Sequence, residues 1–138
     1  IIKIEMNIYL DIDGILLTKY GTLVPGAPDF VKYIVEKHNV YWLTTWCKDG
    51  TSDRALEILK KHFPEESWDH LKKINPASWQ TWKTEAIDFS KDFRWIDDVI
   101  FPQEEQVLKE NNVEDKLVLI DMPHDWTAIR TLISNLGL

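Results

Sequence analysis

Cysteine and long apolar runs are scarce in this chain of 138 residues. The single cysteine, Cys47, excludes an intrachain disulfide and fits a reducing compartment. The apolar runs fall well short of the ~20 residues that a membrane-spanning helix needs. The start of the sequence also lacks a basic segment followed by an apolar stretch and a small-residue cleavage site. We therefore expect a cytoplasmic location and no membrane partner.

Basic residues are also scarce, with 16 Lys and Arg against 23 Asp and Glu and a net charge of −7. This balance excludes a broad nucleic-acid-binding surface, because neutralising phosphates requires clustered Lys and Arg. The charge balance does not exclude a small local basic pocket. The acidity is local: residues 84–125 hold twelve acids and four bases, a net of −8, and the remaining chain sums to +1. Such a region can bind a cation.

The length predicts one domain over residues 1–138. Short apolar strands alternate with amphipathic helices, a pattern typical of βαβ units. We expect strands over 6–11, 40–44, 93–96 and 116–121, with a further short strand over 71–74 that turns at 75–76. We expect helices over 28–38, 53–63, 82–90 and 102–110, a last helix after Asp125, and a small flap over 15–26. The fold class is therefore α/β, a three-layer Rossmann-like domain with a mainly parallel sheet and helices on both faces.

Polar side chains follow several of these strands. In open α/β sheets the ligand lies beyond the carboxyl ends of the strands, so polar residues at those ends are candidates for a site. The candidates are Asp11 and Asp13 after the first strand, Thr44 and Thr45 after the second, Lys83 in the helix 82–90, and Asp97 and Asp98 after the strand 93–96.

The types of these residues indicate phosphoryl chemistry. Carboxylates that converge repel one another unless a cation neutralises them or one takes a proton. Magnesium prefers oxygen ligands and uses substrate phosphate to complete its coordination. One Asp is then available as a nucleophile, and a second Asp two residues along can act as general acid and then general base. Lys83 and Thr44 would hold phosphoryl oxygens.

The segments NIYLDIDGIL, VYWLT and WIDD, with Lys83 before the last, resemble the haloacid dehalogenase (HAD) superfamily of hydrolases. The resemblance spans residues 7–98 and keeps the motif order of that family. It implies that Asp11 is the nucleophile and a metal ligand. It also implies that Asp13 is the acid/base and that its backbone carbonyl touches Mg²⁺.

By the same resemblance, Thr44 and Lys83 bind the phosphoryl group, and Asp97 and Asp98 complete the metal site. Which of these two aspartates ligates directly stays open. An Asp at the second position of the first motif is the family's phosphatase pattern, which favours hydrolysis of a phosphate monoester. The alternative is a HAD-like binding or scaffold module without turnover. A response-regulator receiver domain is disfavoured, because receivers place the lysine last and here Asp97 follows Lys83.

The spacing between motifs bears on the substrate. Asp13 and Thr44 are 31 residues apart, Thr44 and Lys83 are 39 apart, and the expected elements fill both intervals. We therefore expect no cap domain. Capless members of the resembled family act on large or exposed substrates, among them phosphoproteins, nucleic-acid ends and polysaccharide phosphates, and some act on small molecules by forming oligomers. The oligomeric state stays open.

Seven tryptophans are the other unusual feature. Thr45, Trp46 and Trp82 are candidate substrate-binding residues, and Trp79 lies between them in the sequence. Tryptophan rings near Thr44 and Lys83 can stack on a base or a sugar of the substrate. The alternative is that they pack in the core. The segments TTW, WxxWK and WIDD are similar to a small bacterial HAD subgroup that is grouped with predicted RNA-repair proteins.

Overall fold

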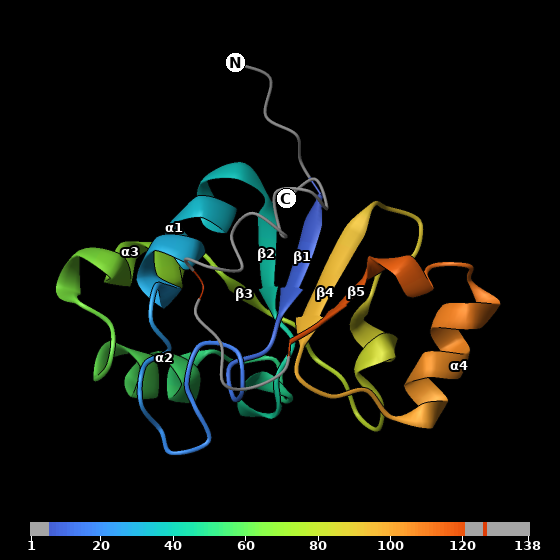
Figure 1. Cartoon of the computed structure of the whole chain (residues 1–138), viewed down its shortest axis with the longest axis horizontal. Coiled ribbons are helices and arrows are strands. Elements are labelled where there is room, and N and C mark those ends of the chain that lie inside the picture. The colour runs from blue at the N-terminus through green and yellow to red at the C-terminus, as the bar shows by residue number, and fades with distance from the viewer. Residues whose placement is uncertain (1–5, 121–125, 127–138) are drawn as a thin grey trace.

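The protein was analysed as a computed structural model that describes residues 6–120 and Trp126. Its strands form one parallel sheet in the order β3-β2-β1-β4-β5 (Figure 1). This order is that of a Rossmann-like fold, in which the chain starts at the centre, moves to one edge and returns to the other side. The strands are β1 (Asn7–Leu10), β2 (Asn39–Trp42), β3 (Asn75–Pro76), β4 (Phe93–Asp97) and β5 (Leu117–Leu119).

Helices cover both faces of this sheet (Figure 1). Three helices pack on one face and the fourth on the opposite face, which confirms the predicted three layers. Within the described residues, no helix has the length and apolar character of a membrane span. The helices are α1 (Ala27–Lys37), α2 (Asp53–Lys60), α3 (Trp68–Lys72) and α4 (Pro102–Glu110), joined by 3₁₀ turns over Thr45–Cys47, Glu65–Ser67, Lys83–Ala86 and Glu114–Lys116.

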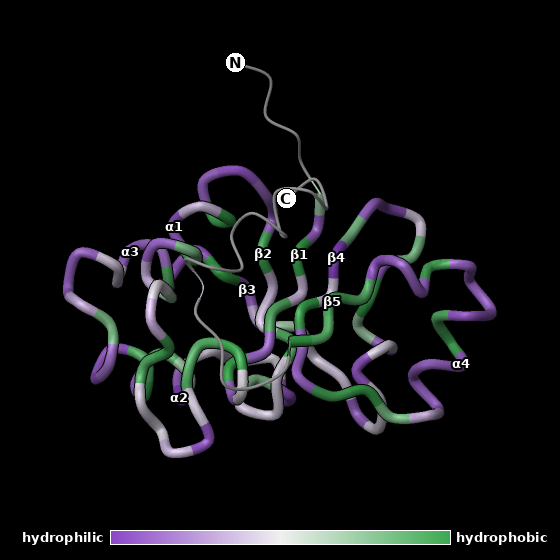
Figure 2. The backbone as a smooth tube through the Cα atoms, in the orientation of Figure 1, coloured by the Kyte–Doolittle hydropathy of each residue, from purple (hydrophilic) through white to green (hydrophobic). Residues whose placement is uncertain are grey.

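Strand β1 is buried over its whole length because it lies in the middle of the sheet. Successive side chains of a strand point to opposite faces. Ile8 and Leu10 belong to the core beneath α1, α2 and α3, and Tyr9 belongs to the core beneath α4 with Leu108. In Figure 2 the apolar segments of the backbone lie partly in the central strands and partly in the loops and helices around them.

The predicted strand over 71–74 is wrong. Leu71 lies in α3, and Leu71 and Ile74 are both buried while the two lysines between them are exposed. A spacing of three puts both apolar side chains on one face of a helical turn. The third strand is instead β3, over the residues predicted to form a turn. Pro76 is tolerated there because β3 is an edge strand that pairs with β2 alone.

The predicted helix over 82–90 is also wrong, because only the 3₁₀ turn Lys83–Ala86 forms there. The carboxylate of Glu85 accepts hydrogen bonds from the backbone N–H groups of residues 80–82 at 2.8–3.2 Å. The chain leaves the turn at Ile87 in an extended conformation. The backbone N–H of Asp88 then donates to the Tyr9 hydroxyl at 3.0 Å rather than to a helix carbonyl.

The predicted flap after β1 is a compact loop over 15–26. Leu17 and Leu23 form an isolated antiparallel bridge, and Ile15 lies fully buried beneath it. Trp126 holds both ends of the loop: its indole N–H donates to the Ile15 carbonyl at 2.8 Å and its backbone N–H to the Pro25 carbonyl at 3.0 Å. The last predicted helix lies outside the described residues, apart from Trp126.

Candidate functional site

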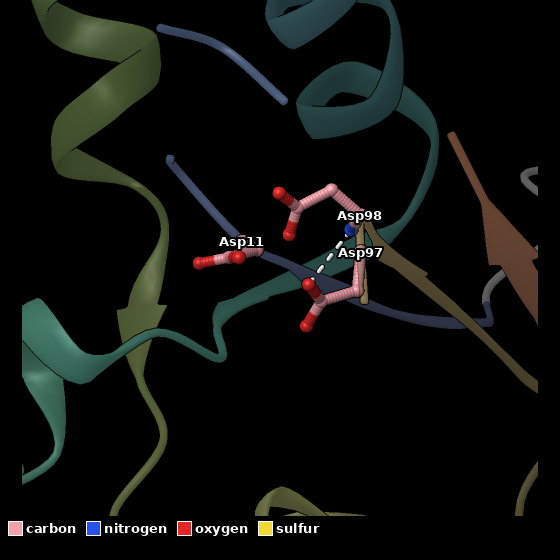
Figure 3. Close-up of side chains that lie close together, drawn as sticks. All are labelled: Asp11, Asp97 and Asp98. Atoms are coloured by element: carbon pink, nitrogen blue, oxygen red, sulfur yellow. Dashed lines mark hydrogen bonds between the residues drawn. The ribbon is translucent and has the colours of Figure 1, made fainter. Parts of the chain in front are cut away.

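Three carboxylates meet at the carboxyl edge of the sheet. Asp11 directly follows β1, and Asp97 and Asp98 lie at the end of β4, the strand beside it. Carboxylate oxygens of the three residues lie within 4.8 Å of one another (Figure 3). Strands β1 and β4 flank the point where the strand order reverses, which is the ligand position expected of this topology.

Asp97 is fully buried, and hydrogen bonds occupy both of its carboxylate oxygens. Oδ2 accepts from the Lys83 ammonium at 2.7 Å and from the Trp95 indole at 3.2 Å. Oδ1 accepts from the backbone N–H groups of Asp98 at 2.8 Å and Val99 at 3.3 Å. Since each oxygen already has two donors, Asp97 serves to position its neighbours and Asp98 presents the more accessible carboxylate.

Lys83 sits between two of these acids. Its ammonium lies 2.7 Å from Asp97 Oδ2 and 3.4 Å from Asp11 Oδ2. Burial on its own would lower the pKa of Lys83, but Asp11 and Asp97 raise it above the usual value. The group is therefore a cation at neutral pH, and one positive charge faces three acids.

The Lys83 ammonium does not fully neutralise the carboxylates of Asp11, Asp97 and Asp98. Burial and the neighbouring Asp97 hold the pKa of Asp11 well above its usual range, and Lys83 only partly offsets them. Burial and Asp97 also raise the pKa of Asp98 to about 6. A divalent cation would remove this repulsion, and three carboxylates are the hard oxygen donors that Mg²⁺ prefers. The side chains present therefore fit a magnesium ion.

Asp13 lies outside the three-carboxylate cluster but lines the same pocket, which has a volume of about 380 Å³. Asp13 is exposed, and its Oδ2 accepts a hydrogen bond from the Trp46 indole at 2.8 Å. The pocket also contains Asp11, Lys83 and Asp98. The structure thus brings four of the predicted catalytic and metal-binding side chains to one cavity.

The two threonines after β2 have different surroundings. Thr44 is fully buried, and its hydroxyl accepts the Trp46 backbone N–H at 3.3 Å, which caps the following 3₁₀ turn. Thr45 is exposed and lines the pocket. The role of Thr44 in binding a phosphoryl group stays a prediction. Trp82 is not among the residues that line the pocket, and its ring centroid lies 6.0 Å from that of the lining residue Phe101.

Glu104 and Gly14 are among the residues of the site that sequence reasoning missed. Glu104 is buried, accepts the Lys83 backbone N–H at 2.9 Å and accepts the Phe101 backbone N–H at 3.0 Å. Its position in the first turn of α4 is a recognisable capping signal, but its contact with Lys83 is not visible in sequence. Gly14 has φ +80°, and a Cβ atom there would lie 2.6 Å from Asp98 Cγ. This glycine gives Asp98 the room to lie beside Asp11.

Comparisons with protein-family models, with curated proteins and with solved structures each found no match. The fold and the geometry of the site therefore carry the functional argument.

Proposed function

We propose that the chain is a magnesium-dependent phosphohydrolase of the HAD type that cleaves a phosphate monoester through an aspartyl-phosphate on Asp11. The observation that carries this proposal is the setting of Asp11. Its carboxylate follows the central strand, faces Lys83 at 3.4 Å, lies within 4.8 Å of two further acids and opens into the 380 Å³ pocket. A carboxylate beside a cation site and an ammonium can act as a nucleophile on phosphorus.

The metal would be held by Asp11 and Asp98 together with the backbone carbonyl of Asp13. Asp97 would act indirectly, because its oxygens already accept four hydrogen bonds. When bound, the ion would withdraw charge from the phosphoryl oxygens and favour the ionised form of Asp11. Since burial and Asp97 raise the pKa of Asp11, this second effect would help nucleophilic attack.

In the first step an Asp11 oxygen forms a bond to phosphorus, and the bond from phosphorus to the ester oxygen breaks. Asp13 gives its proton to the departing oxygen. In the second step Asp13 takes a proton from water, whose oxygen attacks phosphorus and releases inorganic phosphate and free Asp11. Lys83 offsets the negative charge that develops on the phosphoryl oxygens in both steps.

The topology also supports this proposal over a receiver domain. Flavodoxin-like folds such as receivers have the strand order 2-1-3-4-5, whereas this sheet has the order β3-β2-β1-β4-β5. Helix α1 and β2 occupy much of the interval between Asp13 and Thr44, and α2, α3 and β3 occupy much of the interval from Thr44 to Lys83. Because these elements of the sheet domain occupy the two intervals, little chain is left for a cap domain. This favours a site that is open to a large or exposed substrate.

Hydrolysis of p-nitrophenyl phosphate, measured with Mg²⁺ and with EDTA, tests the proposal. We expect turnover that requires the metal and that falls by about a thousand-fold or more in Asp11→Asn, because the amide cannot form the acyl phosphate. Asp29→Asn is a matched control, since Asp29 is an exposed acid on α1. Metal-independent turnover, or turnover unchanged in Asp11→Asn, contradicts the proposal. Magnesium binding without turnover would support a binding module instead.

A further inference from the structure

A second groove, of about 600 Å³, adjoins the pocket that contains Asp11. The two cavities share Thr45, Lys48 and Trp79 in their walls. The second groove continues past them to Trp46 and Arg54. A substrate whose phosphate lies at Asp11 can therefore extend directly into this groove.

Two tryptophans form fixed walls of this groove. The Trp46 indole N–H donates to Asp13 at 2.8 Å, and the Trp79 indole N–H donates to the Thr44 carbonyl at 3.4 Å. The Trp79 backbone N–H also donates to the Lys48 carbonyl at 3.2 Å. Rings held in this way lose little freedom when a ligand stacks on them, and aromatic stacking on a base contributes about 1–3 kcal/mol.

Two cations accompany these rings. The Lys48 ammonium lies 4.5 Å from the Trp79 ring centroid, and the Arg54 guanidinium lies 5.2 Å from that of Trp46. Over residues 6–120, neither cation has a carboxylate at ion-pair distance. The acid in the groove, Asp49, accepts two hydrogen bonds from Thr51 through Oδ1. Unlike Lys83, the cations of the groove are thus available to an external anion.

We propose that this groove binds a nucleotide unit with a second phosphate, while the first phosphate lies at Asp11. The two tryptophans offer aromatic faces to a base, and Lys48 and Arg54 offer positive charge to the second phosphate. A nucleoside bisphosphate and the phosphorylated end of a single-stranded nucleic acid share this chemistry. A singly phosphorylated peptide does not, because it has neither a base nor a second phosphate. The inference rests on the proposed function, since it assigns the substrate class of the same site.

Relative kcat/KM values test the groove. The substrates are p-nitrophenyl phosphate, adenosine 5′-monophosphate, adenosine 3′,5′-bisphosphate, a 5′- and a 3′-phosphorylated single-stranded hexanucleotide, and a phosphoserine peptide. We expect at least one substrate with two phosphates to exceed the monophosphate by about ten-fold, as one charged contact would give. A preference for the bisphosphate identifies a free nucleotide, and a preference for a hexanucleotide identifies a nucleic-acid end.

Arg54→Ala tests the same inference through the protein. It should remove most of that ten-fold ratio, because Arg54 lies in the groove and outside the Asp11 pocket. Lys60→Ala is the matched control, since Lys60 lies on the same helix and its ammonium is 5.4 Å from the ring of Trp68. In Lys60→Ala, the ratio of kcat/KM for the substrate with two phosphates to that for the monophosphate should equal the ratio in the parent protein.

The failure of this inference differs from the failure of the proposed function. If p-nitrophenyl phosphate is hydrolysed and the ratio is one, or the phosphopeptide is preferred, the inference is overturned and the phosphohydrolase stands. If nothing is hydrolysed, binding of a fluorescein-labelled 5′-phosphorylated hexanucleotide decides. An affinity, measured by fluorescence polarisation, that is about ten-fold weaker in Arg54→Ala supports the nucleotide-binding role of the groove. Binding that is absent, or equal in both proteins, overturns it.

Discussion

The indole N–H of Trp46 donates a 2.8 Å hydrogen bond to the Asp13 carboxylate, joining residues 33 positions apart in the sequence. Trp46 lies in the 3₁₀ turn after β2, and Asp13 lies in the loop after β1. Because β1 and β2 pair in parallel register, both loops leave the same edge of the sheet. The orientation of the proposed acid/base thus depends on an aromatic residue of the neighbouring loop.

Replacing Trp46 with Phe should lower kcat for p-nitrophenyl phosphate by roughly ten-fold or more, because a hydrogen bond to a charged group is worth about 1.5–3 kcal/mol. An aromatic ring remains at this partly exposed position, so the thermal unfolding midpoint should change little. Trp68→Phe is the matched control, since it removes an indole hydrogen bond to the Phe63 carbonyl away from the site. Equal kcat values for the two variants would show that the Asp13 contact has no positioning role.

Gly14→Ala should impair the metal site more than Gly21→Ala. Both glycines have positive φ, +80° and +75°, so each substitution carries a backbone cost of about 1–3 kcal/mol. A Cβ at Gly14 would also overlap the Asp98 carboxylate, whereas a Cβ at Gly21 meets nothing within 4 Å. We expect both variants to unfold at lower temperature and only Gly14→Ala to need more Mg²⁺ for half-maximal turnover. A similar Mg²⁺ requirement in both would contradict the placement of Asp98 at the metal.

The contribution of Asp98 to the stability of the metal-free protein should become unfavourable as the pH rises from about 4 to about 6. Burial and Asp97 raise the pKa of Asp98 from its ordinary value of 3.8 to about 6, so the folded state binds more protons than the unfolded state in this window. The destabilisation is complete above that window and absent below it. Since Asp98 is partly open to solvent, this destabilisation is on the order of 1 kcal/mol or less.

Asp98→Asn removes this titration while keeping the shape of the side chain. In EDTA, its unfolding midpoint should match that of the parent protein at pH 4 and exceed it at pH 7, as measured by thermal denaturation. The raised pKa of Asp11 affects both proteins and largely cancels in the difference. A difference that is the same at both pH values would refute the assignment of this titration to Asp98.

Cys47 should be inert toward thiol reagents in the folded protein. Its side chain is fully buried, and burial together with Asp49 raises its pKa to about 12. Since the thiolate is the reactive species, labelling by a disulfide reagent at pH 8 should be slow and should become rapid and stoichiometric in guanidinium chloride. Rapid labelling of the native protein would contradict the packing of the turn that follows Thr44.

The α/β architecture and the convergence of Asp11 and Asp97 could be predicted because both follow from local patterns. An apolar strand that ends in an acid is visible in a few residues, and parallel pairing brings such ends to one edge. The contacts that shape the site are long-range: Glu104 reaches the Lys83 backbone across 21 residues, and Gly14 makes room for Asp98. No local pattern encodes these contacts.

The errors over 71–74 and 82–90 have different origins. Leu71 and Ile74 satisfy a helical spacing within a run too short to distinguish helix from strand. Glu85 draws the preceding backbone N–H groups to its carboxylate, which leaves a single turn where the apolar pattern predicts a full helix.

Trp126 connects the loop over 15–26 to helix α1. Its ring stacks on Phe30 at 3.8 Å, and its two N–H groups hold the carbonyls of Ile15 and Pro25. The indole thus links helix α1 to both ends of the loop that begins two residues after Asp13. The anchoring of the loop beside the proposed acid/base therefore involves a residue 111 positions from Ile15 in the sequence.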